Sequence, residues 1–286
     1  MIFQNVMVFG AGTMGAGIAQ TCALAGADVT LCDPSPDALR RGQRIIEADL
    51  KKGVELKKIT AEQETAARNR LKYEGGLADC TGAELVIEAI PEELKAKREL
   101  FVRLDKELPP PTILATNTST LSVTAIAAVT RFPDRVCGLH FLNPAQRMKP
   151  VEVVAAMQTA PDVIERCRQF IGEIGKEPIV AKDTPGFVVN RCIQPLFGEA
   201  LRCLNENVAE VQEIDEILRL GGFTAGAFEL LDRIGVDTFY VTTRAIWEGM
   251  FHDSRYRPHI IHRKMIEAGH LGCKAGRGFY EYPDVQ

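Results

Sequence analysis

Val6-Met7-Val8-Phe9-Gly10-Ala11-Gly12-Thr13-Met14-Gly15-Ala16-Gly17-Ile18-Ala19-Gln20 is the stretch that decides the fold. A short apolar run ends in glycines and a helix-compatible segment follows at once, so Gly10, Gly12 and Gly15 fit G-x-G-x-x-G in a strand–turn–helix context. The first glycine permits a tight turn, the second lets a pyrophosphate approach the backbone, and the third lets the helix pack on the strand. The helix N-terminus adds free N–H groups that attract phosphate. We therefore predict a dinucleotide site, against the alternative of a glycine-rich turn that binds nothing.

An acidic residue at the end of the next strand supports this prediction. The stretch 28–33 is strand-like and ends in Asp33, about 20 residues beyond the glycines, where the dinucleotide pattern places a carboxylate. Such a carboxylate accepts hydrogen bonds from the ribose hydroxyls and repels a 2′-phosphate, so NAD is favoured over NADP as the cofactor. The residues expected to contact this part of the cofactor are Gly10, Gly12, Thr13, Met14, Gly15 and Asp33.

The composition is that of an ordinary globular protein. The chain has 286 residues, of which 46% are hydrophobic and 25% charged, enough for a large core and two domains. A net charge of −4 argues against nucleic acid as a partner, and no apolar run approaches the length of a membrane span. No targeting segment is recognisable, so we expect a cytoplasmic protein. No metal site is expected, because His259 and His262 lack a cysteine or carboxylate that would complete a ligand cluster.

Strand-like and helix-like segments alternate up to about residue 183, which predicts an α/β fold with a doubly wound, mostly parallel sheet of the Rossmann type. Residues 38–70 read as two consecutive helices, that is, as a helical hairpin inserted after the second strand. Asp183-Thr184-Pro185-Gly186 forms a punctuated joint, and strand-like runs are nearly absent after it. We predict an NAD-binding domain over residues 1–183 and an all-α domain over residues 184–286.

Polar side chains follow several of the predicted strands, at the sheet edge where ligands gather in such folds. They are Glu88, Glu92, Asn117, Ser119, His140 and Asn143, and we expect all of them to face the crevice that holds the nicotinamide. Glu152 lies on the next strand, close enough in a hairpin-like return to contact His140. A carboxylate on one imidazole nitrogen fixes the tautomer and leaves the other nitrogen to take a proton near neutral pH. A histidine at a strand end is often only structural, but this combination favours His140 as a general base.

These residues also carry a resemblance to a known family. The chain resembles the L-3-hydroxyacyl-CoA dehydrogenases, in particular the compact bacterial 3-hydroxybutyryl-CoA dehydrogenases. The matching stretches include the glycine loop, 87–92, 117–119, His140-Phe141-Leu142-Asn143-Pro144, 151–154, Lys182 to Arg191, 228–232 and 276–280. They span essentially the whole chain, and the His-x-x-Asn-Pro and Asp-Thr-Pro-Gly-Phe segments are far more specific than the glycines.

The resemblance implies an NAD-dependent oxidoreductase of fatty acid metabolism (β-oxidation) that converts a 3-hydroxyacyl-CoA to the 3-ketoacyl-CoA and back. It implies these roles: His140 as base, Glu152 as its orienting partner, Ser119 and Asn190 as contacts to the reacting oxygen and thioester, Glu92, Lys97, Asn117 and Asn143 as cofactor contacts, and Lys51 and Lys57 as contacts to the CoA nucleotide. It also implies that the helical domain forms a homodimer and closes over the acyl-CoA substrate.

Two other functions are kept as alternatives, and one position raises a question of substrate. The alternatives are a related dehydrogenase of a free hydroxy or sugar acid, similar to L-gulonate 3-dehydrogenases, and a non-enzymatic, crystallin-like relative. Gln146 and Arg147 depart from the small apolar residues usual in the family after Asn143-Pro144. One hypothesis is that Arg147 accommodates an acyl chain with a distal carboxylate. The competing interpretation is a solvent-facing arginine.

Overall fold

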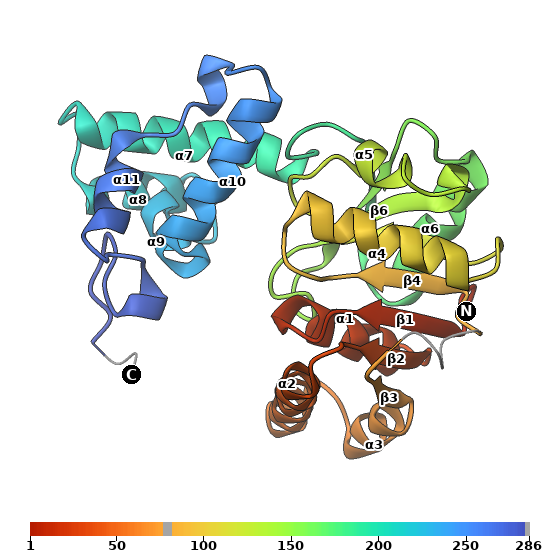
Figure 1. Cartoon of the computed structure of the whole chain (residues 1–286). Coiled ribbons are helices and arrows are strands. Elements are labelled where there is room, and N and C mark those ends of the chain that lie inside the picture. The colour runs from red at the N-terminus through yellow and green to blue at the C-terminus, as the bar shows by residue number, and fades with distance from the viewer. Residues whose placement is uncertain (77–81, 284–286) are drawn as a thin grey trace. The chain divides into compact units, whose positions relative to one another are not determined.

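The chain divides into two compact units, Met1–Thr184 and Pro185–Gln286 (Figure 1). A computed structural model describes residues 1–76 and 82–283. In the described part of the chain, no helix combines the length and the apolar character that crossing a membrane requires.

An eight-stranded sheet forms the centre of the first unit, with the order β3-β2-β1-β4-β5-β6-β7-β8. The strands are β1 Asn5–Phe9, β2 Asp28–Cys32, β3 Leu71–Glu74, β4 Leu85–Glu88, β5 Ile113–Thr116, β6 Val136–Phe141, β7 Pro150–Ala155 and β8 Glu177–Lys182. Strands β1 to β6 pair in parallel, β7 returns antiparallel to β6, and β8 is parallel to β7. The predicted doubly wound, mostly parallel sheet is therefore confirmed.

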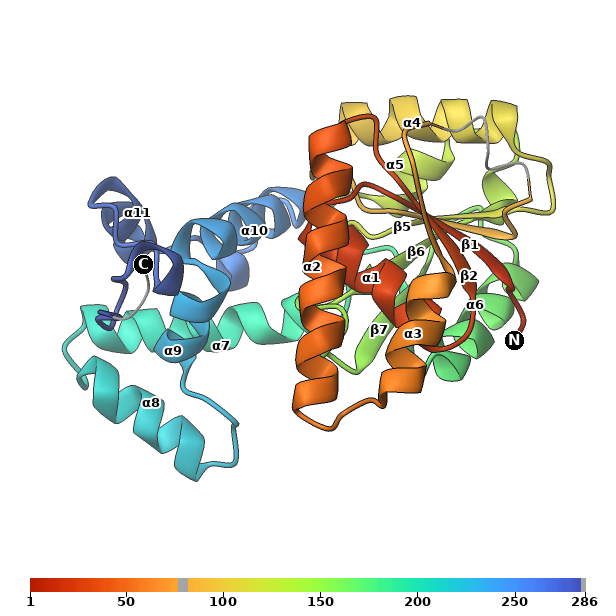
Figure 2. The ribbon, with the colours of Figure 1, turned by 90° about the horizontal axis from the view of Figure 1, so that it is seen from below.

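Helices cover both faces of this sheet. They are α1 Thr13–Leu24, α2 Pro36–Glu55, α3 Ala61–Asn69, α4 Leu94–Glu107, α5 Val123–Ala127 and α6 Pro161–Glu173, with a 3₁₀ turn at Pro133–Arg135. Figure 2 shows α4 and α5 on one side of the sheet and α1, α2, α3 and α6 on the other. The α2–α3 hairpin has clear start signals, because Ser35 caps α2 and Thr60 forms a capping box with Gln63 at α3.

The core of the first unit lies between the sheet and its helices. Phe3, Ile18 and Leu31 are fully buried, and Phe170 of α6 packs edge-on against Phe3 with ring centroids 5.3 Å apart. Burial of this apolar surface is the main favourable contribution to folding. It fixes the positions of the strand ends that carry the polar residues.

The second unit is all-α. Its helices are α7 Val189–Asn205, α8 Val211–Leu220, α9 Ala227–Ile234, α10 Val236–Gly249 and α11 Ile260–Glu267, with 3₁₀ turns at Ser254–Tyr256 and Cys273–Ala275. Phe197, Phe228 and Phe239 form its core. The buried Asp232 accepts hydrogen bonds from the Phe279 and Tyr280 amides and the Tyr282 hydroxyl, and this ties the last described turn to α9.

His262 of α11 is a buried titratable group in this core. It is 1% exposed, its ring packs near those of Phe239 and Tyr240, and neither ring nitrogen has a hydrogen-bond partner among the described residues. Burial, with a smaller contribution from the charge of nearby His259, lowers the pKa of His262 to about 4. Because its ordinary pKa is 6.5, the imidazole is neutral in the folded protein and becomes charged first in the unfolded chain.

This buried imidazole predicts a loss of stability in acid. Between pH 6.5 and 4 the unfolded chain binds more protons at His262 than the folded chain, so the free energy of unfolding falls as the pH is lowered through that window. The resulting decrease in the free energy of unfolding reaches about 3 kcal/mol at pH 4. We expect His262→Phe, which keeps an aromatic ring, to flatten the pH dependence of urea unfolding between pH 6.5 and 4. An unchanged slope in that variant would contradict the prediction.

Candidate active site

The glycine loop between β1 and α1 has a backbone that only glycine fits. Gly10 has φ +108°, and a Cβ placed on it would lie 2.6 Å from the carbonyl oxygen of Ala89 at the end of the neighbouring β4 segment. A Cβ on Gly15 would overlap the carbonyl oxygen of Gly10. The first and third glycines therefore allow the turn and the close packing of α1 on β1.

The same loop fits the pyrophosphate of a dinucleotide. Apart from its chain neighbours Ala11 and Thr13, no described residue places an atom within 4 Å of the Cβ position of Gly12, so its backbone is open to close approach. Gly12 is also the N-cap of α1 and provides no side-chain cap, which leaves the first-turn amides of Thr13 and Met14 to an anion. Asp33 stands beside the loop, since its carboxylate accepts hydrogen bonds from the Ala11 amide and the Ser35 amide, both at 2.9 Å.

His140 and Glu152 face each other across β6 and β7. The antiparallel register pairs these two residues directly, and opposite side chains on one face of such a pair lie within contact distance. His140 Nδ1 lies 2.7 Å from Glu152 Oε2. The two residues are 4% and 0% exposed, so the hydrogen bond is shielded from water. The structure thus brings together the pair that the hairpin-like return predicts.

Ser119 contacts the other imidazole nitrogen. Its Oγ, in the loop after β5, lies 3.0 Å from His140 Nε2. Glu152, His140 and Ser119 therefore form a line of hydrogen bonds that runs from a buried carboxylate to a hydroxyl at the carboxyl end of the parallel strands. An imidazole held by a carboxylate on one side and facing a hydroxyl on the other is suited to move a proton to or from an alcohol.

The asparagines expected in the site occupy different positions. Asn117 Oδ1 accepts a hydrogen bond from the Phe141 amide at 2.8 Å, which ties the end of β5 to the end of β6. Asn143 is exposed in the loop after β6. Asn190 lies in the first turn of α7, in the second unit, and its contact with substrate stays a prediction.

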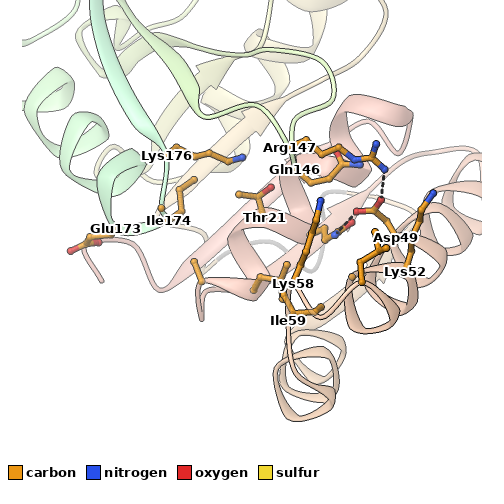
Figure 3. Close-up of a pocket in the computed structure, with 16 residues that line it drawn as sticks. Thr21, Asp49, Lys52, Lys58, Ile59, Gln146, Arg147, Glu173, Ile174 and Lys176 are labelled. Carbon is orange, nitrogen blue, oxygen red and sulfur yellow. Dashed lines mark hydrogen bonds and ion pairs between the residues drawn. The ribbon is translucent and has the colours of Figure 1, made fainter. Parts of the chain in front are cut away.

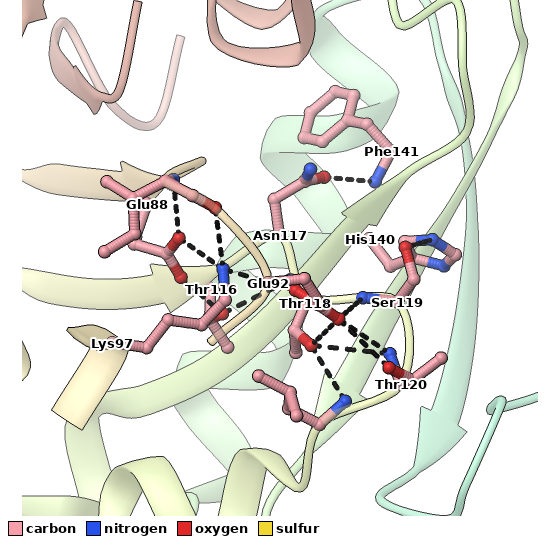
Figure 4. A network of polar contacts seen from close by, with 12 residues as sticks. Glu88, Glu92, Lys97, Thr116, Asn117, Thr118, Ser119, Thr120, His140 and Phe141 are labelled. Carbon is pink, nitrogen blue, oxygen red and sulfur yellow. Dashed lines mark hydrogen bonds and ion pairs between the residues drawn. The ribbon is translucent and has the colours of Figure 1, made fainter. Parts of the chain in front are cut away.

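The position of Glu88 differs from the one predicted from the sequence. We expected it to face the crevice, but its carboxylate is 0% exposed at the end of β4. It accepts hydrogen bonds from Lys97 Nζ at 2.5 Å and from the Thr116 hydroxyl and the Ile90 amide, both at 2.7 Å (Figure 4). Burial raises the pKa of Glu88, against the opposing effects of Lys97 and these hydrogen bonds. The fold pairs the carboxylate with a lysine of the next helix, and a buried charge needs such a partner.

Lys97 is equally enclosed. It is 1% exposed, and its ammonium group also donates to the Ile90 carbonyl at 3.2 Å and lies 3.4 Å from Glu92 Oε2. The ammonium group of Lys97 points to these protein oxygens. The cofactor contact expected of Lys97 stays a prediction. The sequence signal for the Glu88–Lys97 pair would have been a charge at the end of an otherwise apolar strand.

A cavity of about 650 Å³ lies on the outer side of α1, between α2 and the loop that follows β6 (Figure 3). Its basic lining residues are Lys52, Lys58, Arg147 and Lys176. Lys51 and Lys57, which the sequence had suggested as ligand contacts, are exposed and are not among the residues that line it. The helical period explains the difference for Lys51, because residues 49, 52 and 53 share one face of α2 whereas residue 51 points at least about 100° away from each of them. Lys57 and Lys58 lie in the turn that follows α2.

Two of the four cations in the cavity have evident protein partners. Lys176 Nζ donates to the carbonyls of Ala145 and Met148 at 2.7 and 2.8 Å and so holds the loop after β6. Arg147 Nη2 lies 3.3 Å from Asp49 Oδ1. In the described part of the chain, no ion pair within 4.0 Å involves Lys52 or Lys58.

Comparisons with known proteins show the family to which the chain belongs. Residues 5–184 match the family model described as 3-hydroxyacyl-CoA dehydrogenase, NAD binding domain, and residues 186–282 match that described as 3-hydroxyacyl-CoA dehydrogenase, C-terminal domain. The chain is 41% identical to a probable 3-hydroxybutyryl-CoA dehydrogenase of Bacillus subtilis over 99% of both chains. It is 42% identical to the 3-hydroxyadipyl-CoA dehydrogenase of Escherichia coli, over 98% of this chain and 59% of that protein. A crystal structure of 3-hydroxybutyryl-CoA dehydrogenase from Escherichia coli superposes with a TM-score of 0.95 at 41% identity, covering 99% of this chain and 60% of that one.

Proposed function

Because the chain belongs to the 3-hydroxyacyl-CoA dehydrogenase family, we propose that it interconverts short L-3-hydroxyacyl-CoA and 3-ketoacyl-CoA thioesters with His140 as the general acid/base. The protein is an NAD-dependent oxidoreductase of this family. The observation that carries the assignment of roles is the line of hydrogen bonds from Glu152 through His140 to Ser119 at the carboxyl end of the sheet.

The chemistry follows from these contacts. In the oxidation, His140 takes the proton of the 3-hydroxyl at Nε2, the nitrogen that faces Ser119. Glu152 holds the ring through Nδ1 and stabilises the imidazolium that forms, while the Ser119 hydroxyl helps to orient the reacting oxygen. The glycine loop would hold NAD, which would supply the acceptor for the hydride that leaves C3. In the reduction, the imidazolium returns the proton to the same oxygen. Asn190 would complete the contacts to the thioester.

The basic cavity supports a site for the nucleotide part of CoA. Lys52 and Lys58 line it and are available to phosphate groups, which carry several negative charges. Arg147 lies in the same cavity and forms an ion pair with Asp49. This supports Arg147 as a neighbour of bound CoA rather than as a contact to the distal end of an acyl chain. We therefore propose Lys52 and Lys58, in place of Lys51 and Lys57, as the principal CoA contacts.

The family suggests further properties. We propose a homodimer formed through the helical unit, in which Val241 and Phe251 leave large apolar side chains 66% and 95% exposed. We also propose that the enzyme acts in the cytoplasm, as the bacterial relatives suggest.

A spectrophotometric assay tests the reaction. We expect NADH to form from L-3-hydroxybutyryl-CoA, but not at a comparable rate from free 3-hydroxybutyrate or L-gulonate. His140→Ala should lower kcat about 100- to 10,000-fold, the usual contribution of a general base, with the Kd for NADH within about twofold of the original protein. Inactivity on every CoA thioester would refute the proposed function, and loss of NADH affinity in the variant would assign His140 a structural role.

Two double variants that each remove two lysine charges test the CoA site. Replacing both Lys52 and Lys58 by alanine should raise KM for 3-hydroxybutyryl-CoA about 3- to 10-fold, since each exposed ion pair is worth up to about 1 kcal/mol. The same pair should leave KM for the pantetheine thioester, which lacks the nucleotide, unchanged. Replacing Lys51 and Lys57 is the matched control, because it removes the same charge from the same helix end. Equal effects of the two pairs would show that only overall charge matters.

A further inference from the structure

Glu92 is bound to the loop that carries Ser119. Its Oε1 accepts hydrogen bonds from the Thr118 hydroxyl at 2.6 Å, the Ser119 amide at 2.9 Å, the Thr120 amide at 3.1 Å and the Thr120 hydroxyl at 3.2 Å (Figure 4). A single carboxylate oxygen therefore gathers three consecutive residues of the turn after β5. The Ser119 side chain leaves this turn to meet His140 Nε2 at 3.0 Å.

The opposite oxygen of Glu92 is held from the interior. Glu92 Oε2 lies 3.4 Å from Lys97 Nζ, and Lys97 is in turn fixed by the buried Glu88. Burial raises the pKa of Glu92, but the charge of Lys97 and the hydrogen bonds from Thr118, Ser119 and Thr120 outweigh it, so the net shift is downward. The group is thus ionised at neutral pH, and an ionised carboxylate is purely an acceptor and makes the stronger, charge-assisted hydrogen bonds.

We infer that Glu92 is a positioning residue that sets the Ser119 hydroxyl against His140, and that the Glu88–Lys97 pair holds Glu92 for this purpose. The inference rests on the proposed function, because it gives a role to the serine of that site. The resemblance by itself implied only a cofactor contact for Glu92. The observed contacts of Glu92 are with the Ser119 loop. We therefore expect substitutions of Glu92 to change kcat rather than the affinity for NADH.

The loop has other hydrogen bonds that keep it folded without Glu92. The Thr118 amide donates to the Thr116 hydroxyl at 3.2 Å, and the Leu121 amide donates to the Thr118 hydroxyl at 2.9 Å. We therefore expect Glu92→Ala to fold, with a Ser119 side chain that samples more positions. Glu92→Gln keeps an amide oxygen for the two backbone amides and serves as the conservative variant.

A double-mutant cycle with Ser119→Ala tests the inference. If Glu92 acts through Ser119, Glu92→Ala lowers kcat about 10- to 100-fold in the original protein but less than about threefold in the Ser119→Ala background, because the group it positions is already gone. The Kd for NADH stays within about twofold, and Glu92→Gln keeps kcat within about threefold. Glu93→Ala, one residue further along the exposed turn, is the matched control and should change neither quantity.

Two results would overturn the inference. Additive losses in kcat together with a Kd for NADH raised more than about fivefold would make Glu92 a cofactor contact, and an unchanged kcat in Glu92→Ala would leave it without a role. A measurement that does not depend on turnover separates failure of this inference from failure of the proposed function. In ¹⁵N-histidine-labelled protein, Glu92→Ala should displace the His140 Nε2 signal in the same direction as Ser119→Ala, and Glu93→Ala should leave it in place. An unmoved signal in Glu92→Ala would contradict the inference even if the enzyme acted on another substrate.

Discussion

The antiparallel return of β7 along β6 is the constraint on which the rest of the site depends. Six strands run in parallel, and a seventh parallel strand would not bring Glu152 opposite His140. Because β7 reverses, the two side chains meet on one face at 2.7 Å and are buried together. A slip of one residue in this register would turn Glu152 to the other face of the sheet. Lys176 contributes to the register by binding two carbonyls of the loop that joins the two strands.

The sheet also brings the glycine loop and the proposed base to one edge. Parallel strands bring their carboxyl ends to one edge, and the strand order changes direction at β1 and β4. The glycine loop follows β1, the Ser119 loop follows β5, and His140 lies near the end of β6. The segment after β4 packs on Gly10 through Ala89 and on the Ser119 loop through Glu92. One short segment thus connects the dinucleotide loop to the acid/base residues.

The sequence predicted the strands, the helices and the pairing of neighbouring strands, which depend on local pattern. It did not predict which way individual side chains point or which charged groups are buried. Alternating apolar runs placed the strands and helices, and the hairpin return was enough to pair His140 with Glu152. The sequence did not distinguish Lys52 from Lys51, because a one-residue step on a helix turns a side chain by about 100°, which a count of lysines does not register. Lys57 and Lys58 lie in the turn after α2, where no helical period applies. The burial of Glu88 with Lys97 depends on how α4 packs against β4, and this is not encoded in the spacing of the two residues.

In the proposed reaction, the hydrogen bond between Glu152 and His140 makes the imidazole an effective base. The most direct test is kcat of Glu152→Gln with L-3-hydroxybutyryl-CoA and NAD, since the amide keeps the shape of the side chain but removes the charge that stabilises the imidazolium. We expect kcat to fall at least about 100-fold while the Kd for NADH and the thermal unfolding midpoint stay near those of the original protein. A kcat within about threefold of the original, in a folded variant, would contradict it.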